Sequence, residues 1–179
     1  MTAVASPDAH ARARRVRLAL FDVDGVLTDG RLYYGPGGEA MKVFNILDGH
    51  GLKMLAQTGV ATGLLSGRVS EAAAARAREL GMSHVILGAQ DKLAHFEALL
   101  ARLGLDAGQC AFVGDDLPDL PVLGRCGFAA AVANAVPEVR ASAHLVTGAA
   151  GGNGAVREFC EFVMRAQDTF AGAAARHRA

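Results

Sequence analysis

Two aspartates spaced two residues apart, Asp22 and Asp24, follow a run of four apolar residues and precede a glycine. An apolar run that ends in turn residues is typical of a buried strand in a parallel sheet. Side chains two residues apart along a strand point to the same face, so both carboxylates would project together at the carboxyl end of the strand. Like charges this close need a cation or a shared proton. The pair therefore indicates a site for a hard divalent ion such as Mg²⁺, with a simple acidic turn as the alternative.

Three further apolar runs of the chain are also followed by groups that could bind a metal ion or a phosphate. These groups are Ser66 with Gly67 and Arg68, Lys92, and the carboxylates Asp115, Asp116 and Asp119. The carboxyl ends of parallel strands meet at one crevice of an α/β sheet. Carboxylates for a metal ion, hydrogen-bond donors and a fixed cation are the parts that hold a phosphate group.

The elements that must position these groups follow from the hydrophobic pattern. Apolar runs typical of buried strands alternate with segments that have helical periodicity. The strands are expected at 18–21, 59–65, 84–87, 110–113 and 128–131, with an edge strand at 144–146. The helices are expected at 48–57 with Asp48 as N-cap, 70–80, 92–103, 118–123, from Pro137, and 155–167. This alternation predicts an α/β fold with a doubly wound, mostly parallel sheet.

The chain is expected to form a single domain over 17–168. A Gly/Pro turn flanked by two short strand-like runs predicts a β-hairpin at about 30–45. Residues 1–16 carry several arginines without a helix or strand period and are predicted to form a flexible, solvated tail rather than a nucleic-acid site. A second tail is expected at 169–179.

The composition excludes several classes of partner. The chain has 179 residues, 51% of them hydrophobic, and its 18 basic residues balance 18 acidic ones. A net charge of zero gives no indication of a nucleic-acid or membrane partner. The three cysteines are scattered, which favours reduced thiols, and no apolar run approaches the length of a membrane span. We expect a cytoplasmic protein.

Four of these segments, taken in order, resemble the motifs of the haloacid dehalogenase (HAD) superfamily of phosphatases. They are Asp22-x-Asp24-Gly25, Ser66, Lys92 and Gly114-Asp115-Asp116-x-x-Asp119. Additional segments are similar to the octulosonate phosphatase group of this superfamily and to its nonulosonate relatives. They are Asp22 to Gly30, the hairpin, Phe44-Asn45 with Asp48-Gly49-x-Gly51, Gly114 to Pro121, and Gly151 to Glu158.

The resemblance implies a role for each aspartate of the first pair. Asp22 would be the nucleophile that forms an aspartyl-phosphate. Asp24 would protonate the leaving group as general acid and then activate water as general base. The cofactor would be Mg²⁺, bound by the carboxylates of Asp22 and Asp115 and the backbone carbonyl of Asp24.

The same resemblance implies supporting roles for the other groups. Ser66 would donate a hydrogen bond to a phosphoryl oxygen, and Lys92 would neutralise the charge that develops there. Asp116 and Asp119 would support the metal site from behind its direct ligands.

The spacing of the motifs leaves no room for a cap domain. Only 41 residues separate Asp24 from Ser66, and 25 separate Ser66 from Lys92. An open site needs a macromolecular substrate or a neighbouring subunit to exclude water. The resemblance implies the second: a homotetramer whose hairpins assemble and whose C-terminal segments reach neighbouring sites.

The function implied is hydrolysis of a keto-sugar-acid phosphate, with 3-deoxy-D-manno-octulosonate (KDO) 8-phosphate, a lipopolysaccharide precursor, as the expected substrate. The alternatives are a nonulosonate 9-phosphate phosphatase and a non-catalytic oligomeric module with the same fold. Candidates for binding the substrate carboxylate are Arg68, Arg76 and, from a neighbour, Arg157, although Arg76 could instead form a surface salt bridge. Leu47 and Asn153 stand where this group often has basic residues.

Overall fold

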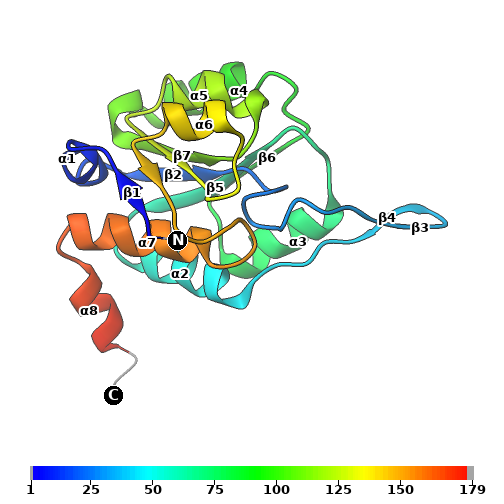
Figure 1. Cartoon of the computed structure of the whole chain (residues 1–179), viewed down its shortest axis with the longest axis horizontal. Helices are drawn as coiled ribbons and strands as arrows, with labels where there is room; N and C mark the ends of the chain where they lie inside the picture. The colour runs from blue at the N-terminus through cyan, green and yellow to red at the C-terminus, as the bar shows by residue number, and fades with distance from the viewer. Residues whose placement is uncertain (1, 177–179) are drawn as a thin grey trace.

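The computed structural model describes residues 2–176 and consists of a central sheet with helices on both faces (Figure 1). The sheet has seven strands in the order β1-β9-β8-β7-β2-β5-β6. Helices α4, α5 and α6 cover one face, and α2, α3 and α7 cover the other. The predicted doubly wound α/β fold is confirmed.

The strands that were predicted from apolar runs all form. They are β2 (Leu18–Phe21), β5 (Ala61–Ser66), β6 (His84–Leu87), β7 (Cys110–Gly114), β8 (Phe128–Ala131) and β9 (Leu145–Val146). All four residues of β2 are buried, and β2 pairs in parallel with both β5 and β7. This central strand therefore delivers Asp22 and Asp24 to the middle of the crevice at the strands' carboxyl ends.

The helices also fall close to their predicted bounds. They are α2 (Ile46–Gln57), α3 (Glu71–Leu80), α4 (Lys92–Leu103), α5 (Leu120–Leu123), α6 (Pro137–Ser142) and α7 (Ala155–Ala166). A further helix, α8 (Phe170–Ala175), was not predicted. Short 3-10 turns span Ala107–Gln109 and Leu117–Asp119. In the described part of the chain, no helix is long and apolar enough to cross a membrane.

The prediction of a flexible tail at 1–16 is wrong for the described part of that segment. Strand β1 (Val4–Ala5) pairs antiparallel with β9, so β9 is not the edge of the sheet as predicted. Helix α1 (Ala9–Ala13) follows, and its two terminal alanines are fully buried. These alanines are four residues apart and share one face of the helix, but a stripe of two small side chains gives almost no hydrophobic period.

The other predicted tail, 169–179, begins with helix α8, in which Ala173 is buried. Residues 177–179 lie outside the described part of the chain. Here too a short run of small residues packs against the body without producing a sequence period that would identify it.

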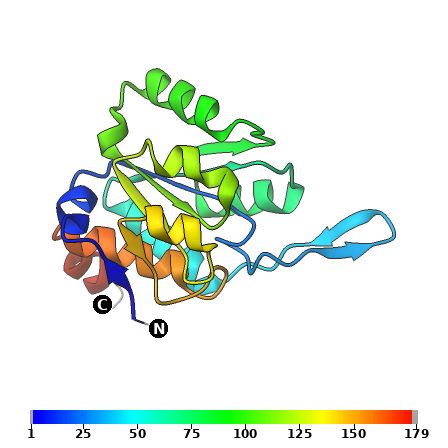
Figure 2. The same cartoon turned by 45° about the horizontal axis from the view of Figure 1, so that its top comes forward.

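The hairpin consists of β3 (Tyr33–Gly35) and β4 (Gly38–Met41) and projects well beyond the body (Figure 2). Between Asp24 and Ser66 the chain forms only this hairpin, α2 and strand β5 of the central sheet, so no cap domain is present there. The absence of a cap in the described residues confirms the prediction from motif spacing.

Helix α2 begins differently from the prediction. Its N-cap is Asn45, whose side chain accepts a hydrogen bond from the amide of Leu47. Asp48 lies one turn further on, only 1% exposed, and accepts hydrogen bonds from the amides of Gly154 (3.2 Å) and Arg157 (2.8 Å). Asp48 thus caps α7 rather than α2, because the N-cap residue of α7 is a glycine with no side chain to offer.

A second contact links the C-terminal part of the chain to the loop after β2. The amide of Gly152 donates to the carbonyl of Val26 at 2.9 Å. A Cβ at Gly151 would lie 1.7 Å from the carbonyl oxygen of Gly25. The two loops therefore touch backbone to backbone, which only glycine permits at this position.

Candidate active site

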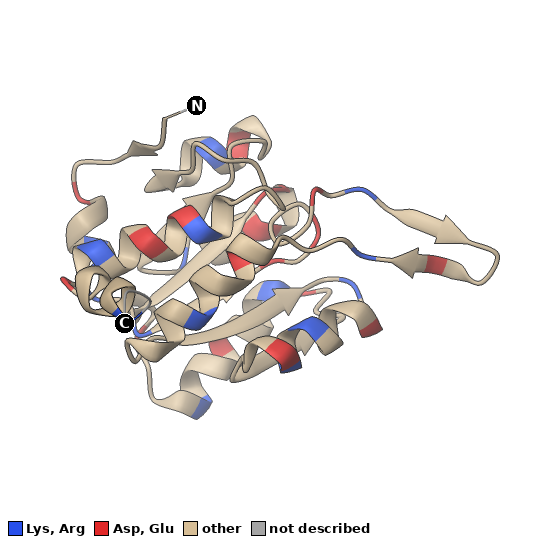
Figure 3. Cartoon of the chain, turned by 90° about the horizontal axis from the view of Figure 1, so that it is seen from below, with Lys and Arg blue, Asp and Glu red and all other residues tan. Residues whose placement is uncertain are grey.

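A cavity of about 290 Å³ opens at the carboxyl ends of β2, β5 and β7. It is lined by Asp22, Asp24, Gly30, Ser66, Gly67, Arg68, Lys92, Asp115, Asp116, Pro118 and Asp119. All the residues predicted from the strand ends therefore lie together. Figure 3 shows acidic residues gathered where the hairpin leaves the body, with basic residues on the hairpin's arms.

Lys92 forms the centre of a buried ion-pair network. Its ammonium nitrogen lies 2.9 Å from Asp22 Oδ2 and 2.6 Å from Asp119 Oδ1, and its side chain is 5% exposed. Burial opposes the charged form of Lys92, but the two carboxylates outweigh it and raise its pKa. Lys92 is therefore a fixed cation beside Asp22.

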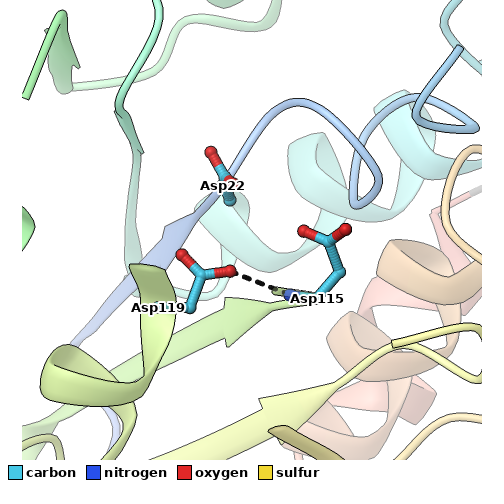
Figure 4. Close-up of side chains that lie close together, drawn as sticks. All are labelled: Asp22, Asp115 and Asp119. Carbon is cyan, nitrogen blue, oxygen red and sulfur yellow. Dashed lines mark hydrogen bonds between the residues drawn. The ribbon is translucent and has the colours of Figure 1, made fainter. Parts of the chain in front are cut away.

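Asp119 uses both of its oxygens within the protein. Oδ1 binds Lys92, and Oδ2 accepts hydrogen bonds from the amides of Asp115 (2.9 Å) and Asp116 (3.3 Å). Figure 4 shows the first of these amide bonds. Asp119 thus orients both the lysine and the loop that carries Asp115.

Asp22 and Asp115 have oxygens available for a cation. Together with Asp119, they place one oxygen each within 4.8 Å of the others. Among the described residues, the buried Oδ1 of Asp115 has no hydrogen-bond partner. Burial, followed by the nearby Asp119 and Asp22, raises the pKa of Asp115 to about 8. An all-oxygen donor set with one unsatisfied buried oxygen fits Mg²⁺.

The glycine after Asp24 makes room for Asp115. A Cβ at Gly25 would lie 2.0 Å from Asp115 Oδ2, and Gly25 has a φ of +88°. Both facts require glycine here. The sequence Asp-x-Asp-Gly therefore reflects a close approach between the loops that follow β2 and β7.

Asp22 is held in one orientation. Its Oδ1 accepts from the amide of Val23 at 2.7 Å, while Oδ2 faces Lys92. Burial is the main cause that raises the pKa of Asp22, and repulsion from Asp119 adds to it. A carboxylate in this environment is more basic than usual, which suits a nucleophile when a cation offsets the burial.

The loop after β5 is fixed by the segment that precedes α4. Ser66 is the buried last residue of β5, and its carbonyl accepts from the amide of Ala89 at 3.0 Å. The carbonyl of Gly67 accepts from Gln90 Nε2 at 2.9 Å. These contacts hold Ser66 and Lys92 on the same side of the cavity.

Glu39, on the hairpin strand that returns to the body, and Lys42, directly after that strand, also belong to the site, and neither was predicted from the sequence. The ammonium of Lys42 donates to Asp24 Oδ1. Glu39 binds Lys42 (3.3 Å) and Arg68 (2.6 Å). Their only sequence signal is a pair of opposite charges three residues apart on a hairpin expected to border the crevice, and such pairs are common on exposed hairpins.

Two of the three candidate arginines do not line this cavity. Arg76 binds Glu79 at 2.8 Å and the carbonyl of Asn45 at 3.4 Å. Arg157 binds Glu161 at 2.7 Å. Arg68 alone among the three lies at the cavity wall.

Comparisons with known proteins agree with this arrangement. Residues 38–127 match the model of the haloacid dehalogenase-like hydrolases. The 3-deoxy-D-manno-octulosonate 8-phosphate phosphatase KdsC of Yersinia pestis is 42% identical over 93% of this chain and 89% of its own length.

Solved structures are similar over almost the whole chain. A probable YrbI-family phosphatase from Pseudomonas syringae superposes with a TM-score of 0.95 at 49% identity, covering 97% of this chain and 99% of its own. The 3-deoxy-D-manno-octulosonate 8-phosphate phosphatase of Moraxella catarrhalis, solved with magnesium, phosphate and KDO, gives a TM-score of 0.93 at 40% identity, with coverages of 95% and 98%.

Proposed function

The chain belongs to the haloacid dehalogenase-like hydrolases, among the 3-deoxy-D-manno-octulosonate 8-phosphate phosphatases, and we propose that it hydrolyses KDO 8-phosphate to KDO and inorganic phosphate. The product would supply lipopolysaccharide synthesis. One observation carries the proposal: Asp22, Lys92 and Asp115 converge from different strand ends on one cavity. The relative from Moraxella catarrhalis, which was solved with both magnesium and KDO, supports the substrate and the cofactor.

The proposed reaction begins with the carboxylate of Asp22. Its oxygen attacks phosphorus, and the bond from phosphorus to the sugar oxygen breaks as the aspartyl-phosphate forms. Lys92, 2.9 Å from Asp22, offsets the negative charge that gathers on the phosphoryl oxygens. Ser66 is proposed to donate a hydrogen bond to one of those oxygens.

Asp24 is proposed to move the protons. Its carboxyl group gives a proton to the departing sugar oxygen, which leaves as a neutral hydroxyl. It then takes a proton from water as that water attacks phosphorus and frees Asp22. One carboxyl group thus serves as acid and then as base, and its charge is restored after each turnover.

The cofactor is Mg²⁺, which we propose is held by the carboxylates of Asp22 and Asp115 and the carbonyl of Asp24. When bound, it supplies the positive charge that allows one anion to approach another. Asp119 orients Lys92 and the Asp115 loop, and Asp116 is proposed to support the same loop.

The substrate carboxylate is proposed to bind Arg68, which lines the cavity. Arg76 and Arg157 stay candidates only through rearrangement or a neighbouring subunit, since both have partners elsewhere in their own chain.

We further propose a homotetramer that closes the open site. Several large apolar side chains on and beside the hairpin are exposed, which fits a surface covered by other copies: Leu32, Tyr34, Met41, Val43 and Ile46. A cytoplasmic location fits the three buried, unpaired cysteines.

The test is phosphate release from KDO 8-phosphate with Mg²⁺, compared with release from a nonulosonate 9-phosphate. A higher kcat/KM for KDO 8-phosphate supports the proposal, while the reverse order favours the nonulosonate alternative. No release from either substrate would favour the non-catalytic alternative. Asp22→Asn should abolish turnover, and activity that survives this change would exclude Asp22 as nucleophile.

A further inference from the structure

Lys42 is the first residue after β4, where the hairpin returns to the body, and its side chain points into the site. Both Met41 and Val43 beside it are exposed. The Lys42 side chain is nevertheless only 2% exposed. A buried ammonium is costly unless it is paired, and Lys42 is paired with Asp24 and Glu39.

The two oxygens of the Asp24 carboxyl group lie in different surroundings. Oδ1 accepts the hydrogen bond from Lys42. Oδ2 is buried and has no hydrogen-bond partner among residues 2–176. The guanidinium of Arg68 lies 3.9 Å from Oδ2, which is beyond hydrogen-bond distance.

An unsatisfied buried oxygen does not stabilise the fold, so its presence in a residue that lines the cavity points to function. A carboxyl group that transfers protons needs one oxygen that is free to bind a proton. It also needs a constraint that keeps this oxygen facing the reacting atoms, because a misplaced donor loses rate. Lys42 provides that constraint by occupying the other oxygen.

We infer that Lys42 is a positioning residue for both proton transfers. It holds Asp24 through Oδ1, so that Oδ2 gives its proton to the sugar oxygen as the phosphorus–oxygen bond breaks. The same Oδ2 then receives the proton of the attacking water. This inference rests on the proposed function and adds the hairpin arm to the machinery that positions Asp24.

Glu39 fixes Lys42 in turn. Its carboxylate accepts from Lys42 at 3.3 Å, Arg68 at 2.6 Å and the hydroxyl of Ser70 at 3.2 Å. Ser70 is the N-cap of α3, so Glu39 connects the hairpin arm to the helix beside the cavity. The position of Asp24 therefore depends on a chain of contacts that begins outside the sheet.

The inference predicts an effect that depends on the leaving group. A sugar alkoxide is a poor leaving group and needs a proton, whereas p-nitrophenolate leaves without one. The ratio kcat/KM covers only the steps up to departure of the leaving group when that step is irreversible. Lys42→Met is expected to lower kcat/KM for the sugar-acid phosphate by about 10²-fold, and for p-nitrophenyl phosphate by less than about threefold.

Three controls separate positioning from loss of structure. Lys42→Arg keeps a donor and is expected to recover part of the loss on the sugar phosphate. Lys53→Met changes an exposed lysine on α2 and is expected to leave both substrates unaffected. The rise in melting temperature on adding Mg²⁺ should be equal in Lys42→Met and the wild type, because Asp22 and Asp115 are untouched.

Equal losses on the two substrates, no loss on the sugar phosphate, or no recovery in Lys42→Arg would each overturn the inference. If Lys42→Met does not fold, Glu39→Gln tests the same point. It is expected to lower kcat/KM less than Lys42→Met would, but again more for the sugar-acid phosphate than for p-nitrophenyl phosphate. Failure of the wild type to hydrolyse either compound would instead remove the proposed function, so the two failures are distinguishable.

Discussion

Two groups of charged residues meet at the cavity, and they are built in different ways. The sheet-end cluster, Asp22, Lys92, Asp115 and Asp119, follows the strand ends and is mostly buried, with contacts of 2.6 and 2.9 Å to its lysine. The hairpin-root cluster, Glu39, Lys42 and Arg68 around Asp24, depends on an arm that leaves the body. Its arginine is 40% exposed.

The difference separates two tasks of an enzyme. Groups that attack phosphorus and hold a metal ion need fixed positions, which packed strands provide. Groups that transfer protons to varied leaving groups or bind the remainder of a substrate can come from more peripheral elements. The sheet-end cluster should therefore control stability and metal binding, while the hairpin-root cluster should control the response to substrate.

The largest effect is expected from breaking the sheet-end cluster at Asp119. Asp119→Ala removes one carboxylate from Lys92 and leaves the amides of Asp115 and Asp116 without an acceptor. The expected loss is about 3 kcal/mol of unfolding free energy, near the lower end for a broken buried pair, because the change also relieves repulsion between carboxylates. Urea denaturation measures it.

The matched control is Asp116→Ala in the same loop. Asp116 is exposed, and its carboxylate accepts from the amide of Leu117 and caps the 3-10 turn that follows. Its removal should cost less than about 1 kcal/mol. Equal losses of unfolding free energy in the two variants would show that Asp119 stabilises the fold no more than an exposed residue of the same loop does.

The next effect is expected from crowding the metal site. Gly25→Ala places a Cβ against Asp115 and forces a non-glycine residue to a φ of +88°. Mg²⁺ affinity measured by isothermal titration calorimetry should fall about 10- to 100-fold, as for other changes behind metal ligands. Gly37→Ala, where a Cβ meets nothing within 4 Å, should leave the affinity unchanged.

A smaller and graded effect is expected from pH. The pKa of Asp115 is raised to about 8 in the folded protein, against 3.8 ordinarily. Its contribution to stability is therefore complete below about pH 4 and is lost as pH rises to about 8 in protein without metal. Mg²⁺ binds the ionised form, so the rise in melting temperature caused by Mg²⁺ should grow from pH 5 to pH 8.

A Mg²⁺ effect that is constant over this range would contradict the assignment of Asp115 as a ligand. Comparing samples with and without Mg²⁺ at each pH removes the contributions of other titrating groups, such as His84 and His144, whose pKa values burial lowers.

The arginine of the hairpin-root cluster should affect substrate binding rather than stability. Arg68→Ala is expected to raise KM for a sugar-acid phosphate about tenfold with a smaller change in kcat, since a contact to the substrate carboxylate is made equally in the ground and transition states. Arg76→Ala, with partners away from the cavity, should leave KM unchanged. The opposite result would move the carboxylate site to Arg76.

The smallest effect on the single chain is expected at the exposed hairpin. Tyr34→Ser should change the unfolding free energy of the chain by no more than about 0.5 kcal/mol, as is usual for exposed positions. If hairpins assemble a tetramer, the same change should lower the mass measured by light scattering after gel filtration. A mass that stays the same would argue against assembly through Tyr34.

The sheet-end cluster could be predicted because its geometry follows from strand order. Asp22, Lys92, Asp115 and Asp119, like Ser66 beside them, each follow or flank a strong apolar run, and parallel strands bring such positions together whatever the details of packing. The fold class followed from the same runs. Strand bounds were predicted well because buried strands are continuously apolar.

The hairpin-root cluster could not be predicted in the same way. The contact between Lys42 and Asp24 depends on the angle at which the hairpin returns to the body, which no local pattern encodes. The role of Asp48 was mistaken for a similar reason: an acidic residue near a helix start favours the N-cap locally, but Asn45 caps α2 and Asp48 caps α7. Both errors concern contacts between elements distant in the sequence.

The contact between Gly152 and the loop after β2 has a consequence for the order in which the enzyme is made. On the ribosome, the Asp22 strand emerges early, but its partner β7 ends at Gly114 and the loop that supports Gly25 comes near residue 151. Contacts so distant in sequence form late, since the intervening chain must be present first. The nascent chain therefore carries Asp22 long before the site around it can form, and the site is complete only after the loop near residue 151 has been made.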